Sequence, residues 1–573
     1  MTKIPNSLKI AGCLLYLCLI CAAGTPQGKA PGGYIQKSRE FCTSDEFQRV
    51  TAGRIRFFRQ PLLKASYGST LLGSRNGIVL RHGDGTVEPF PPDRLLPCPE
   101  ITVLAEERPG ILWIGTMRGA IRYERDRGNS TIQYFVGKRW LPEDHVAGIG
   151  FDPNTGDVWI ETAQGLCSIH FKPMTLAEKA QAFEERVRAR HLRHGLTASS
   201  HLSDPGNLAS SHAVSSDNDG LWTAMYVAAQ CFRYKITGEA SARASAKKGI
   251  EALMKLEAIT GSPGFPARSI IKVGSEDQPA DGEWHLSSDG AWKWKGDTSS
   301  DEIVGHYFAY GLYYELVADA GEKRQIRAVV ERITSHILDH GYRLIDLDGK
   351  PTTWGWWGPD DIWKDPDETG LRALHVLSHL RVAYRITGNV KYEAAYEDLV
   401  RNHMYALLTR NQKINIPGRI NHSDDELAFL SFYPLLRYEQ NPELKKIYEE
   451  SLERSWQCER TERNPLWNFI YAAGTGSRNF DVEESIRTLQ QIPMDLISWS
   501  VVNSHRLDVP IDPLADRFRS KQALVVLPPD ERPLMKWNGN PYNLDGGNSG
   551  RSEDDGAFFL LPYWMGRYHH LIE

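Results

Sequence analysis

Two kinds of predicted helix alternate along the chain from about residue 173 to its end at residue 573. Six segments are apolar on nearly every face, and we expect these helices to begin near Asp219, Glu302, Glu368, Glu426, Leu466 and Asp555. Six further segments are amphipathic, with a single apolar stripe. A helix that is apolar all round is buried, whereas a helix with one stripe packs on the outside. The alternation therefore predicts a mainly α fold for residues 173–573, an (α/α)6 toroid of six inner and six outer helices.

The residues before these helices have the short alternating pattern and glycine turns of β-strands. Three stretches are alike: TLLGSRNGIVLRHGDG from Thr70, LWIGTMRGAIRYERDRG from Leu112 and VWIETAQGLCSIHFKP from Val158. Their spacing of about 42 to 46 residues is that of propeller blades, and residues 112–121 resemble the two-component-regulator propeller repeat. Closed propellers have at least about four blades. We therefore expect residues 24–172 to form an N-terminal β domain of about three propeller-like repeats with a structural role.

Residues 1–23 have the pattern of a secretory signal peptide. Lys3 and Lys9 are followed by an apolar run that is short for a membrane span and then by small, polar residues. We expect cleavage near Ala23 and a secreted or periplasmic protein with no integral membrane segment in the mature chain. The five cysteines that remain include no C-x-x-C pair and allow at most two disulfides, for which Cys42–Cys98 is one candidate.

Charge and aromatic content narrow the class of partner. The net charge is −5, and no block of Lys or Arg supplies the positive surface of a nucleic-acid-binding protein. Nucleic acid is therefore not expected as a partner. Many of the 16 tryptophans lie in two Gly- and Asp-rich segments, residues 282–297 and 353–368, for which we expect loops. Their flat rings suit the faces of sugars, and we expect about half of these tryptophans only to pack these segments against the toroid.

The second apolar helix begins in the segment KGDTSSDEIVGHYFAYGLYYELVA, residues 295–318. Ser299 and Glu302 have the spacing of a capping box, and acids in a first turn suit the helix dipole. One cap needs at most one acid, yet similar helix starts carry runs of three acids at residues 424–426 and 553–555. Crowded carboxylates perturb each other's pKa values, which is typical of catalytic sites. Because the inner helices of a toroid run parallel, we expect these groups to converge on one rim, and the candidate catalytic residues are Asp301, Glu302, His306, Asp424, Asp425, Asp219 and Asp555.

In architecture and in the composition of this rim, residues 175–573 resemble the (α/α)6-toroid carbohydrate-active enzymes. These comprise inverting glycoside hydrolases, unsaturated-uronyl hydrolases and polysaccharide lyases. The resemblance implies an exported enzyme that acts on a poly- or oligosaccharide in a cleft over the toroid, with no required cofactor. The sequence does not decide whether the protein binds a metal ion, and Ca²⁺ is the candidate cation. The candidate substrate-binding residues are Trp222, Trp292, Trp294, Trp356, Trp357, Tyr310, His422, His505, Arg506, Trp537 and Arg551.

Two reactions and one non-catalytic role remain open at this stage. Hydrolysis needs one protonated carboxyl and one carboxylate, about 6.5–9.5 Å apart for inversion, and Asp301 or Glu302 with Asp424 or Asp425 is the expected pair. β-Elimination from a uronate needs a Tyr or His base, for which His306 and Tyr310 are candidates, and a group such as Arg506 that neutralises the substrate. A crowded acidic rim would repel a polyuronate, which favours hydrolysis. A glycan-binding protein whose acids only cap helices is the third alternative.

Overall fold

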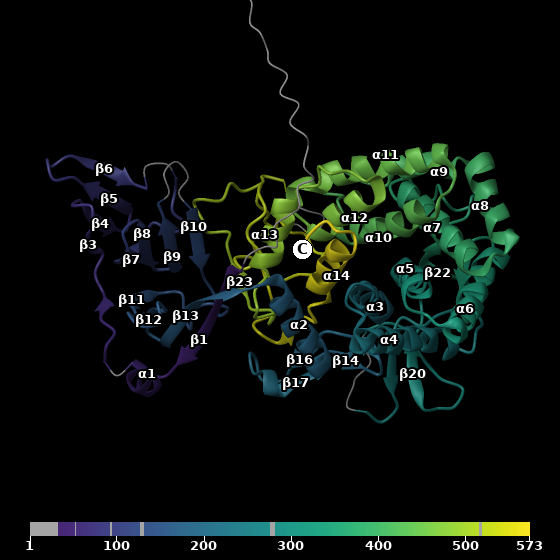
Figure 1. Ribbon diagram of the computed structural model, residues 1–573, viewed down its shortest axis with the longest axis horizontal. Helices are drawn as coiled ribbons and strands as arrows, with labels where there is room; N and C mark the ends of the chain where they lie inside the picture. Colours follow the sequence, from purple (N-terminus) through teal and green to yellow (C-terminus); the bar gives the residue numbers. More distant parts are fainter. Residues whose placement is uncertain are drawn as a thin grey trace, which may run out of the picture.

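The computed structural model describes residues 33–573 apart from 52, 92–93, 126–130, 276–280, 417, 515–517 and 519. A β-rich part built from the first strands lies beside a larger helical part (Figure 1). The predicted signal peptide, residues 1–23, lies outside the described residues, so secretion stays a prediction. No helix in the described part of the chain is long and apolar enough to cross a membrane.

Two rings of helices form the helical part. In the described chain the inner helices are α3 (Asp219–Thr237), α5 (Ser300–Leu316), α7 (Thr369–Thr387), α10 (His422–Tyr438), α12 (Pro465–Thr475) and α14 (Ala557–Tyr568). Each inner helix contacts the next in sequence, and α14 also contacts α3, which closes the ring. The helices packed on their outer side are α2 (Leu176–Arg190), α4 (Ala240–Ala258), α6 (Ala320–Asp339), α8 (Val390–His403), α11 (Pro442–Glu459) and α13 (Val482–Gln491), with the short α9 (Tyr405–Leu408) after α8. The mainly α prediction is confirmed, and the inner helices begin within a few residues of the predicted positions.

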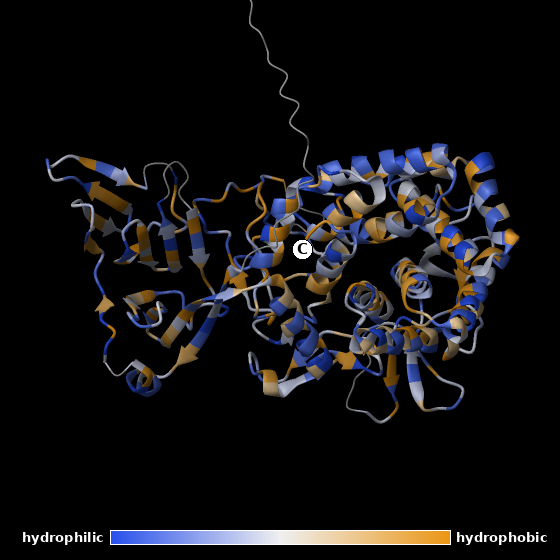
Figure 2. Cartoon of the chain, viewed as in Figure 1, coloured by the Kyte–Doolittle hydropathy of each residue, from blue (hydrophilic) through white to orange (hydrophobic). Residues whose placement is uncertain are grey.

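Hydrophilic residues are frequent on outer helices such as α8 and α11 (Figure 2), and burial distinguishes the two rings, as the hydrophobic patterns predicted. In α5 every residue from Glu302 to Tyr313 is buried, whereas α4 buries only one stripe. Local chemistry sets several helix ends. A capping box of Thr175 and Glu178 begins α2, and α3 ends at Gly238, whose positive φ of 68° glycine adopts without strain.

Three antiparallel sheets follow one another in the β-rich part. The first contains β3 (Leu62–Lys64), β4 (Thr70–Ser74), β5 (Gly77–Arg81) and β6 (Val87–Phe90). The second contains β7 (Ile101–Arg108), β8 (Ile111–Thr116), β9 (Gly119–Glu124) and β10 (Thr131–Phe135). The third contains β11 (Val146–Phe151), β12 (Val158–Thr162) and β13 (Gly165–Met174), with β2 (Phe57–Phe58) and β1 (Tyr34–Cys42) at its edges and α1 (Ser44–Thr51) after β1. The three sequence repeats form the hairpins β4–β5, β8–β9 and β12–β13, and β1 pairs along its whole length with β13, so the start of the β part is tied to its end.

Short strands lie at the ends and edges of the helix ring. They are β14 (Leu192–Arg193) with β15 (Leu196–Thr197), β16 (Ser200–Leu202) with β17 (Ser211–Ala213) and β25 (Ser552–Glu553), β18 (Ile270–Lys272) with β19 (Trp284–Leu286) and β20 (Trp292–Lys295), β21 (Arg343–Ile345) with β22 (Pro351–Trp356), and β23 (Val501–Val502) with β24 (Asp545–Gly546). The tryptophan-rich segments predicted as loops therefore hold the hairpin β19–β20 and most of β22. Their alternating Trp and Lys or Thr residues fit paired strands.

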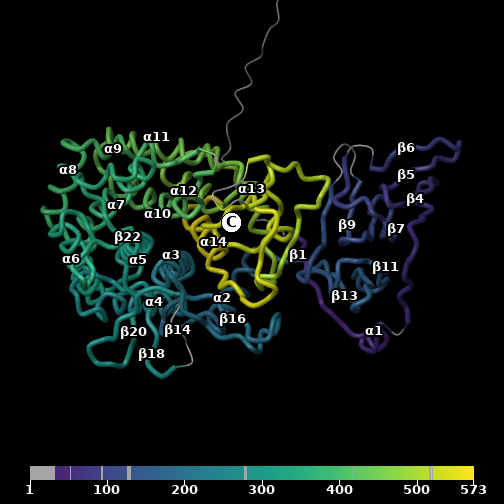
Figure 3. The backbone as a smooth tube through the Cα atoms, turned by 180° about the vertical axis from the view of Figure 1, so that it is seen from behind, coloured from purple at the N-terminus to yellow at the C-terminus, as the bar shows by residue number. Residues whose placement is uncertain are grey.

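A buried polar interface joins the β-rich part to the helical part. Arg139 Nη1 donates to the main-chain oxygen of Arg532 at 2.9 Å, and Trp140 Nε1 donates to that of Asp530 at 3.0 Å. Lys37 of β1 forms an ion pair with the Asp530 carboxylate. The segment between α13 and α14 supplies these partners, and it lies between the two parts in the view of Figure 3.

The predicted Cys42–Cys98 disulfide is wrong. All five cysteines of the described chain are free thiols. Cys42 ends β1 of the third sheet and packs against the cluster that contains Phe47 and Trp159. Cys98 is buried just before β7 of the second sheet. The two residues therefore belong to different sheets, a separation that chain spacing alone did not reveal.

Candidate active site at the helix N-termini

The N-terminal ends of several inner helices meet at one end of the ring. Asn218, just before α3, donates from Nδ2 to Asp301 Oδ1 of α5 at 3.2 Å. Asp301 and Glu368, which directly precedes α7, are both close enough to Asp424 of α10 to raise the pKa of its carboxyl. The predicted convergence is therefore present. We define the carboxylate cluster as Asp301, Glu302, Glu368, Asp424 and Glu426.

Ser299 and Glu302 do not form the predicted capping box. Ser299 is the N-cap residue of α5, but its side chain makes no capping hydrogen bond, and its Oγ lies 3.4 Å from Asn218 Oδ1 instead. The Glu302 carboxylate is turned toward α3, where a Cβ added to Gly220 would overlap its Oε2. Glycine at position 220 thus leaves the space into which Glu302 folds. The capping interpretation does not account for this carboxyl.

Glu302 is fully buried, and neither of its carboxylate oxygens has a hydrogen-bond partner within the described chain. Burial raises the pKa of Glu302 well above its usual range, and the charges of Asp219 and Asp301 add to this effect while Arg268 opposes it. A buried polar group without a partner costs free energy, and such costs are common at functional sites. Burial therefore favours the protonated form of the Glu302 carboxyl.

His306 lies one turn after Glu302 on α5, but it does not pair with the Glu302 carboxylate. Its Nδ1 lies 2.7 Å from the main-chain oxygen of Glu302, so Nδ1 donates and Nε2 is left without a partner in the described part of the chain. The His306 ring is buried beside Tyr310, with the ring centroids 5.6 Å apart, and burial lowers the pKa of His306. Full burial keeps both side chains from touching a ligand at the rim.

Asp424 and Asp301 are half-buried members of the cluster. Burial, followed by the charge of Glu368, raises the pKa of Asp424 to about 7. Burial also raises the pKa of Asp301, whereas Ser299 and Arg268 favour its charged form. A carboxyl that titrates near neutral pH, next to a second carboxylate held by polar groups, is the arrangement that general acid–base chemistry requires.

Glu426 is a cluster residue that the sequence interpretation did not select, although it ends the acidic run at residues 424–426. It is fully buried, and neither of its carboxylate oxygens has a partner in the described chain. Burial raises the pKa of Glu426 to about 8, although the nearby ammonium of Lys536 opposes the change. Lys536 forms an ion pair with Asp555 at 3.0 Å, and its Nζ lies 4.1 Å from the ring centroid of Trp222. Trp222 thus lies beside the cluster, as predicted.

A cavity of about 230 Å³ opens beside Asp424, between the starts of α7 and α10. Glu368 at its wall forms an ion pair with Arg372, whose guanidinium carbon lies 3.3 Å from the ring centroid of Trp356. Arg419, which also lines the cavity, pairs with Asp367 at 2.8 Å. The volume is below the about 300–1,000 Å³ of most ligand pockets, so it suits a single sugar unit rather than a long chain. Glu368 and Arg372 were not predicted as site residues, because a single Glu or a single Arg has no distinctive sequence pattern.

Asp425 belongs to a separate buried group with His422. Lys413 Nζ lies 2.5 Å from Asp425 Oδ2 and also pairs with Glu459, while His422 Nδ1 lies 3.1 Å from Glu462 Oε1. His422, Asp425 and Glu459 could in principle hold a metal ion, since their ligand atoms lie within 4.8 Å of one another. Ca²⁺ takes six to eight oxygen ligands, and here the Lys413 ammonium already pairs with both carboxylates of the group. The group therefore fits an internal ion-pair network better than Ca²⁺.

Asp219 and Asp555 have the contacts of structural residues. Asp219 Oδ2 accepts from Arg193 Nη2 at 2.8 Å and Ser269 Oγ at 2.5 Å, and its Oδ1 accepts from Ser216 Oγ at 2.6 Å. Asp555 accepts from the main-chain N–H of Ala557 at 2.7 Å at the start of α14. Their oxygens are used in holding helix starts, so we expect no chemistry from them.

Most of the other tryptophans predicted to bind substrate are buried or packed against neighbours. Trp294, Trp357 and Trp537 are buried, and Trp292 packs under Lys255 of α4 with the ammonium 3.2 Å from a ring centroid. Arg551 is exposed.

His505 and Arg506 lie at the interface with the β-rich part. His505 Nε2 lies 3.0 Å from the hydroxyl of Tyr134, and Arg506 Nη1 pairs with Glu531 at 2.8 Å. Their position between the two parts could not be seen from the sequence, because it depends on how the β-rich part docks.

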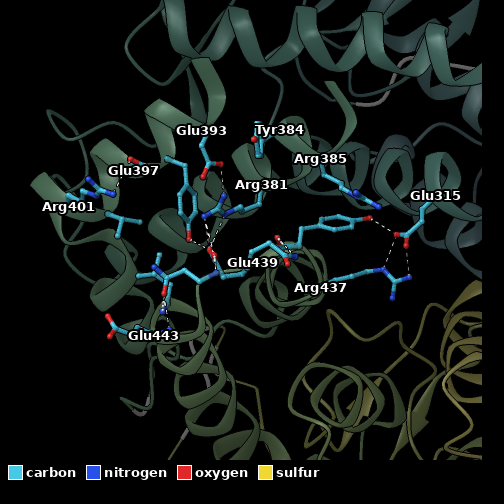
Figure 4. A pocket seen from close by; sticks show the side chains of 16 residues that line it. Glu315, Arg381, Tyr384, Arg385, Glu393, Glu397, Arg401, Arg437, Glu439 and Glu443 are labelled. Atoms are coloured by element: carbon cyan, nitrogen blue, oxygen red, sulfur yellow. Dashed lines mark hydrogen bonds and ion pairs between the residues drawn. The ribbon is translucent and has the colours of Figure 1, made fainter. Parts of the chain in front are cut away.

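A larger cavity, about 1,190 Å³, lies at the other end of the helices, around the ends of α5, α7 and α10. Its charges are largely satisfied internally (Figure 4): Arg381 pairs with Glu393 and Glu439, and Arg437 pairs with Glu315 at 3.0 Å. It is lined by no residue of the carboxylate cluster. Size alone therefore does not make it the candidate site.

Comparison with known proteins gives no sequence match, neither to a family model nor to a curated relative. Among solved structures, the chain is similar to a family 76 glycoside hydrolase from a bovine Bacteroides thetaiotaomicron strain, with a TM-score of 0.40, 10% identity, and coverage of 83% of this chain and 100% of that one. It is also similar to a sugar epimerase from a ruminal bacterium, with a TM-score of 0.40, 12% identity, and coverage of 70% and 100%. A polysaccharide lyase gives a TM-score of 0.33, 10% identity, and coverage of 69% and 98%. These neighbours are enzymes that act on carbohydrates, but scores this low transfer neither fold nor activity.

Proposed function

We propose that this protein is a carbohydrate-active enzyme that hydrolyses glycosidic bonds at the carboxylate cluster. The observation that carries the proposal is Asp424, a half-buried carboxyl with a pKa raised to about 7 beside Asp301 and Glu368. In this mechanism Asp424 is the general acid that protonates the departing glycosidic oxygen. Asp301, whose pKa is raised by burial against the opposing effects of Ser299 and Arg268, is the group that activates water in its carboxylate form.

The surroundings of the cluster support a sugar substrate. Trp356 stacks with Arg372, the partner of Glu368, and Trp222 stacks with Lys536 near Glu426, and both rings offer flat apolar surfaces. Burial raises the pKa of Glu426 to about 8, so this carboxyl adds little negative charge at neutral pH, and burial also raises the pKa of Glu302. The rim is therefore less repulsive than its composition indicates.

β-Elimination is the competing reaction. Its predicted bases, His306 and Tyr310, are fully buried, which disfavours it. Arg268 favours β-elimination. Its guanidinium is half-buried beside Asp301 and Glu302, and it donates hydrogen bonds to neutral oxygens of Asp217, Asp297 and Asn218. Such a group could neutralise a uronate. Product chemistry separates the two reactions.

The test is incubation of the full chain with a panel of neutral and uronate-containing polysaccharides. Hydrolysis predicts new reducing ends without ultraviolet absorbance from an unsaturated uronyl product, and that absorbance would instead identify a lyase. Asp424→Asn and Asp301→Asn should each remove turnover while circular dichroism shows an intact fold. Asp367→Asn is the matched control, because Asp367 lines the same cavity but pairs with Arg419. Retention of the glycan without any product would identify a binding protein.

We also propose that residues 1–23 direct export and that the β-rich part is a structural module of propeller-like repeats. The repeated hairpins and the buried interface support this role. Mass spectrometry of the mature protein should find an N-terminus near residue 24, and an intact Met1 in the mature protein would refute export.

A further inference from the structure

A cavity of about 600 Å³ lies where the β-rich part meets the helical part, and no residue of the carboxylate cluster lines it. Its wall comes from β1, the turn after β10, α2, and the segments 205–208 and 493–499. Four cationic side chains but only two carboxylates line it: Lys37, Arg39, Arg139, Arg186, Asp495 and Glu553. Positive charge therefore exceeds negative charge in the cavity wall.

Both lining carboxylates already have partners. Asp495 Oδ2 accepts from Arg39 Nη2 at 3.1 Å and from Trp499 Nε1 at 2.8 Å. Glu553 accepts two hydrogen bonds from Arg190, both at 2.7 Å, and this pairing helps to lower its pKa to about 2 against the effect of burial. Lys37 is neutralised by Asp530. The positive charge left over belongs to Arg139 and Arg186.

Arg139 is 1% exposed and has a free hydrogen-bonding edge. Its Nη1 donates to the main-chain oxygen of Arg532 at 2.9 Å, but its Nε and Nη2 have no partner in the described part of the chain. No described carboxylate forms an ion pair with it. Nε and Nη2 form one edge of the guanidinium, and this fork binds a carboxylate or sulfate with two parallel hydrogen bonds. A buried guanidinium with an empty fork is costly unless an anion completes it.

Arg186 offers a second free donor to the same cavity. Its Nη2 donates to the main-chain oxygen of Met494 at 2.6 Å, and its Nε lies 3.4 Å from Glu553, while Nη1 has no partner in the described chain. The remaining wall is partly apolar, with Phe41 and Leu208 more than a third exposed. The cavity thus combines donors for an oxyanion with space and apolar surface for the body that carries it.

We propose that this cavity binds an organic anion about the size of one sugar, with its carboxylate or sulfate group held between Arg139 and Arg186. The volume falls within the usual range for small-ligand sites, about 300–1,000 Å³, and exceeds what a bare ion needs. Because the two parts of the protein form the walls together, the ligand also ties them to each other. The site is separate from the proposed hydrolysis, and its test measures binding rather than turnover.

The test is isothermal titration calorimetry of the full chain at low salt with glucuronate, glucose 6-sulfate, glucose and inorganic sulfate. We expect one or both sugar anions to bind in a one-to-one ratio and glucose not to bind. Arg186→Gln should weaken binding by about 10-fold or more, the effect of losing a charged hydrogen bond. Glu553 keeps Arg190 as its partner in this variant, so the fold should survive. Arg139→Gln should have at least as large an effect.

Arg385→Gln is the matched control, since Arg385 is an exposed arginine that lines the cavity of about 1,190 Å³ at the other end of the helices. It should leave binding unchanged. If Arg139→Gln does not fold, Leu208→Trp provides the second variant, because an indole there fills the cavity from its exposed side and should abolish binding. Equal binding of glucose, equal binding of inorganic sulfate, no binding of either sugar anion, or unchanged affinity in Arg186→Gln would each overturn the proposal.

Discussion

Asp424→Asn should remove activity and at the same time stabilise the protein above neutral pH. The pKa of Asp424 is about 7 in the folded chain against an ordinary 3.8. Between about pH 4 and pH 7 the unfolded chain has lost this proton and the folded chain has not, so the wild type loses stability as the pH rises through that window. At about 1.4 kcal/mol per pH unit the full difference is ~4 kcal/mol, and solvent screening of a half-buried group reduces it to ~1–2 kcal/mol.

Urea unfolding of both proteins at pH 4.5 and pH 8 measures this effect. The variant should gain ~1–2 kcal/mol at pH 8 and little at pH 4.5, while kcat on a cleaved glycan falls by at least about 10²-fold, as expected for loss of a general acid. Asp367→Asn, made at a rim carboxylate that pairs with Arg419, should show neither change. Equal stability of Asp424→Asn and wild type at both pH values, with turnover retained, would refute the role of Asp424 and the physical reason for it.

Three smaller changes test other parts of the cluster. Glu368→Gln removes the charge that raises the pKa of Asp424 most after burial, so the alkaline limb of the pH–rate profile should move to lower pH. An unmoved limb would show that Glu368 does not influence Asp424. Gly220→Ala places a Cβ where the Glu302 carboxylate lies; kcat should fall at least about 10-fold and stability by about 1–3 kcal/mol, whereas normal kinetics would show that the position of Glu302 is unimportant. Ser299→Ala should change the unfolding free energy by less than about 0.5 kcal/mol, and a loss of ~1 kcal/mol would restore the capping interpretation.

The helix ring was predictable because its signal is spread over many residues. An apolar segment such as that from Glu302 to Tyr313 must be buried whatever its neighbours are, and its alternation with striped helices leaves few arrangements. The acid-rich helix starts were predictable as a group for the same reason. Parallel inner helices place their first turns on one rim, so Asp301 and Asp424 approach each other although they lie far apart in the sequence.

The role of each acid was not predictable, because it depends on single neighbours from distant segments. Glu302 and Asp219 occupy equivalent helix starts, yet Gly220 leaves space for an unpaired Glu302 carboxylate, whereas Arg193 neutralises Asp219. Asp425 likewise pairs with Lys413 in a buried ion-pair network and does not join the carboxylate cluster. The interface position of Arg506 depends on docking with the β-rich part, which leaves no periodic trace in the sequence.

The structure of the Asp424→Asn variant with a bound oligosaccharide tests the central claim most directly. We expect one sugar unit in the cavity beside position 424 and the rest of the oligosaccharide across the rim. A glycosidic oxygen should lie within hydrogen-bond distance of the side chain at position 424, and a water held by Asp301 should lie near the adjacent anomeric carbon. We also expect contacts from Trp222 or Trp356 to the sugar faces. A chain bound only in the large cavity at the opposite ends of the helices, with the carboxylate cluster untouched, would contradict the account.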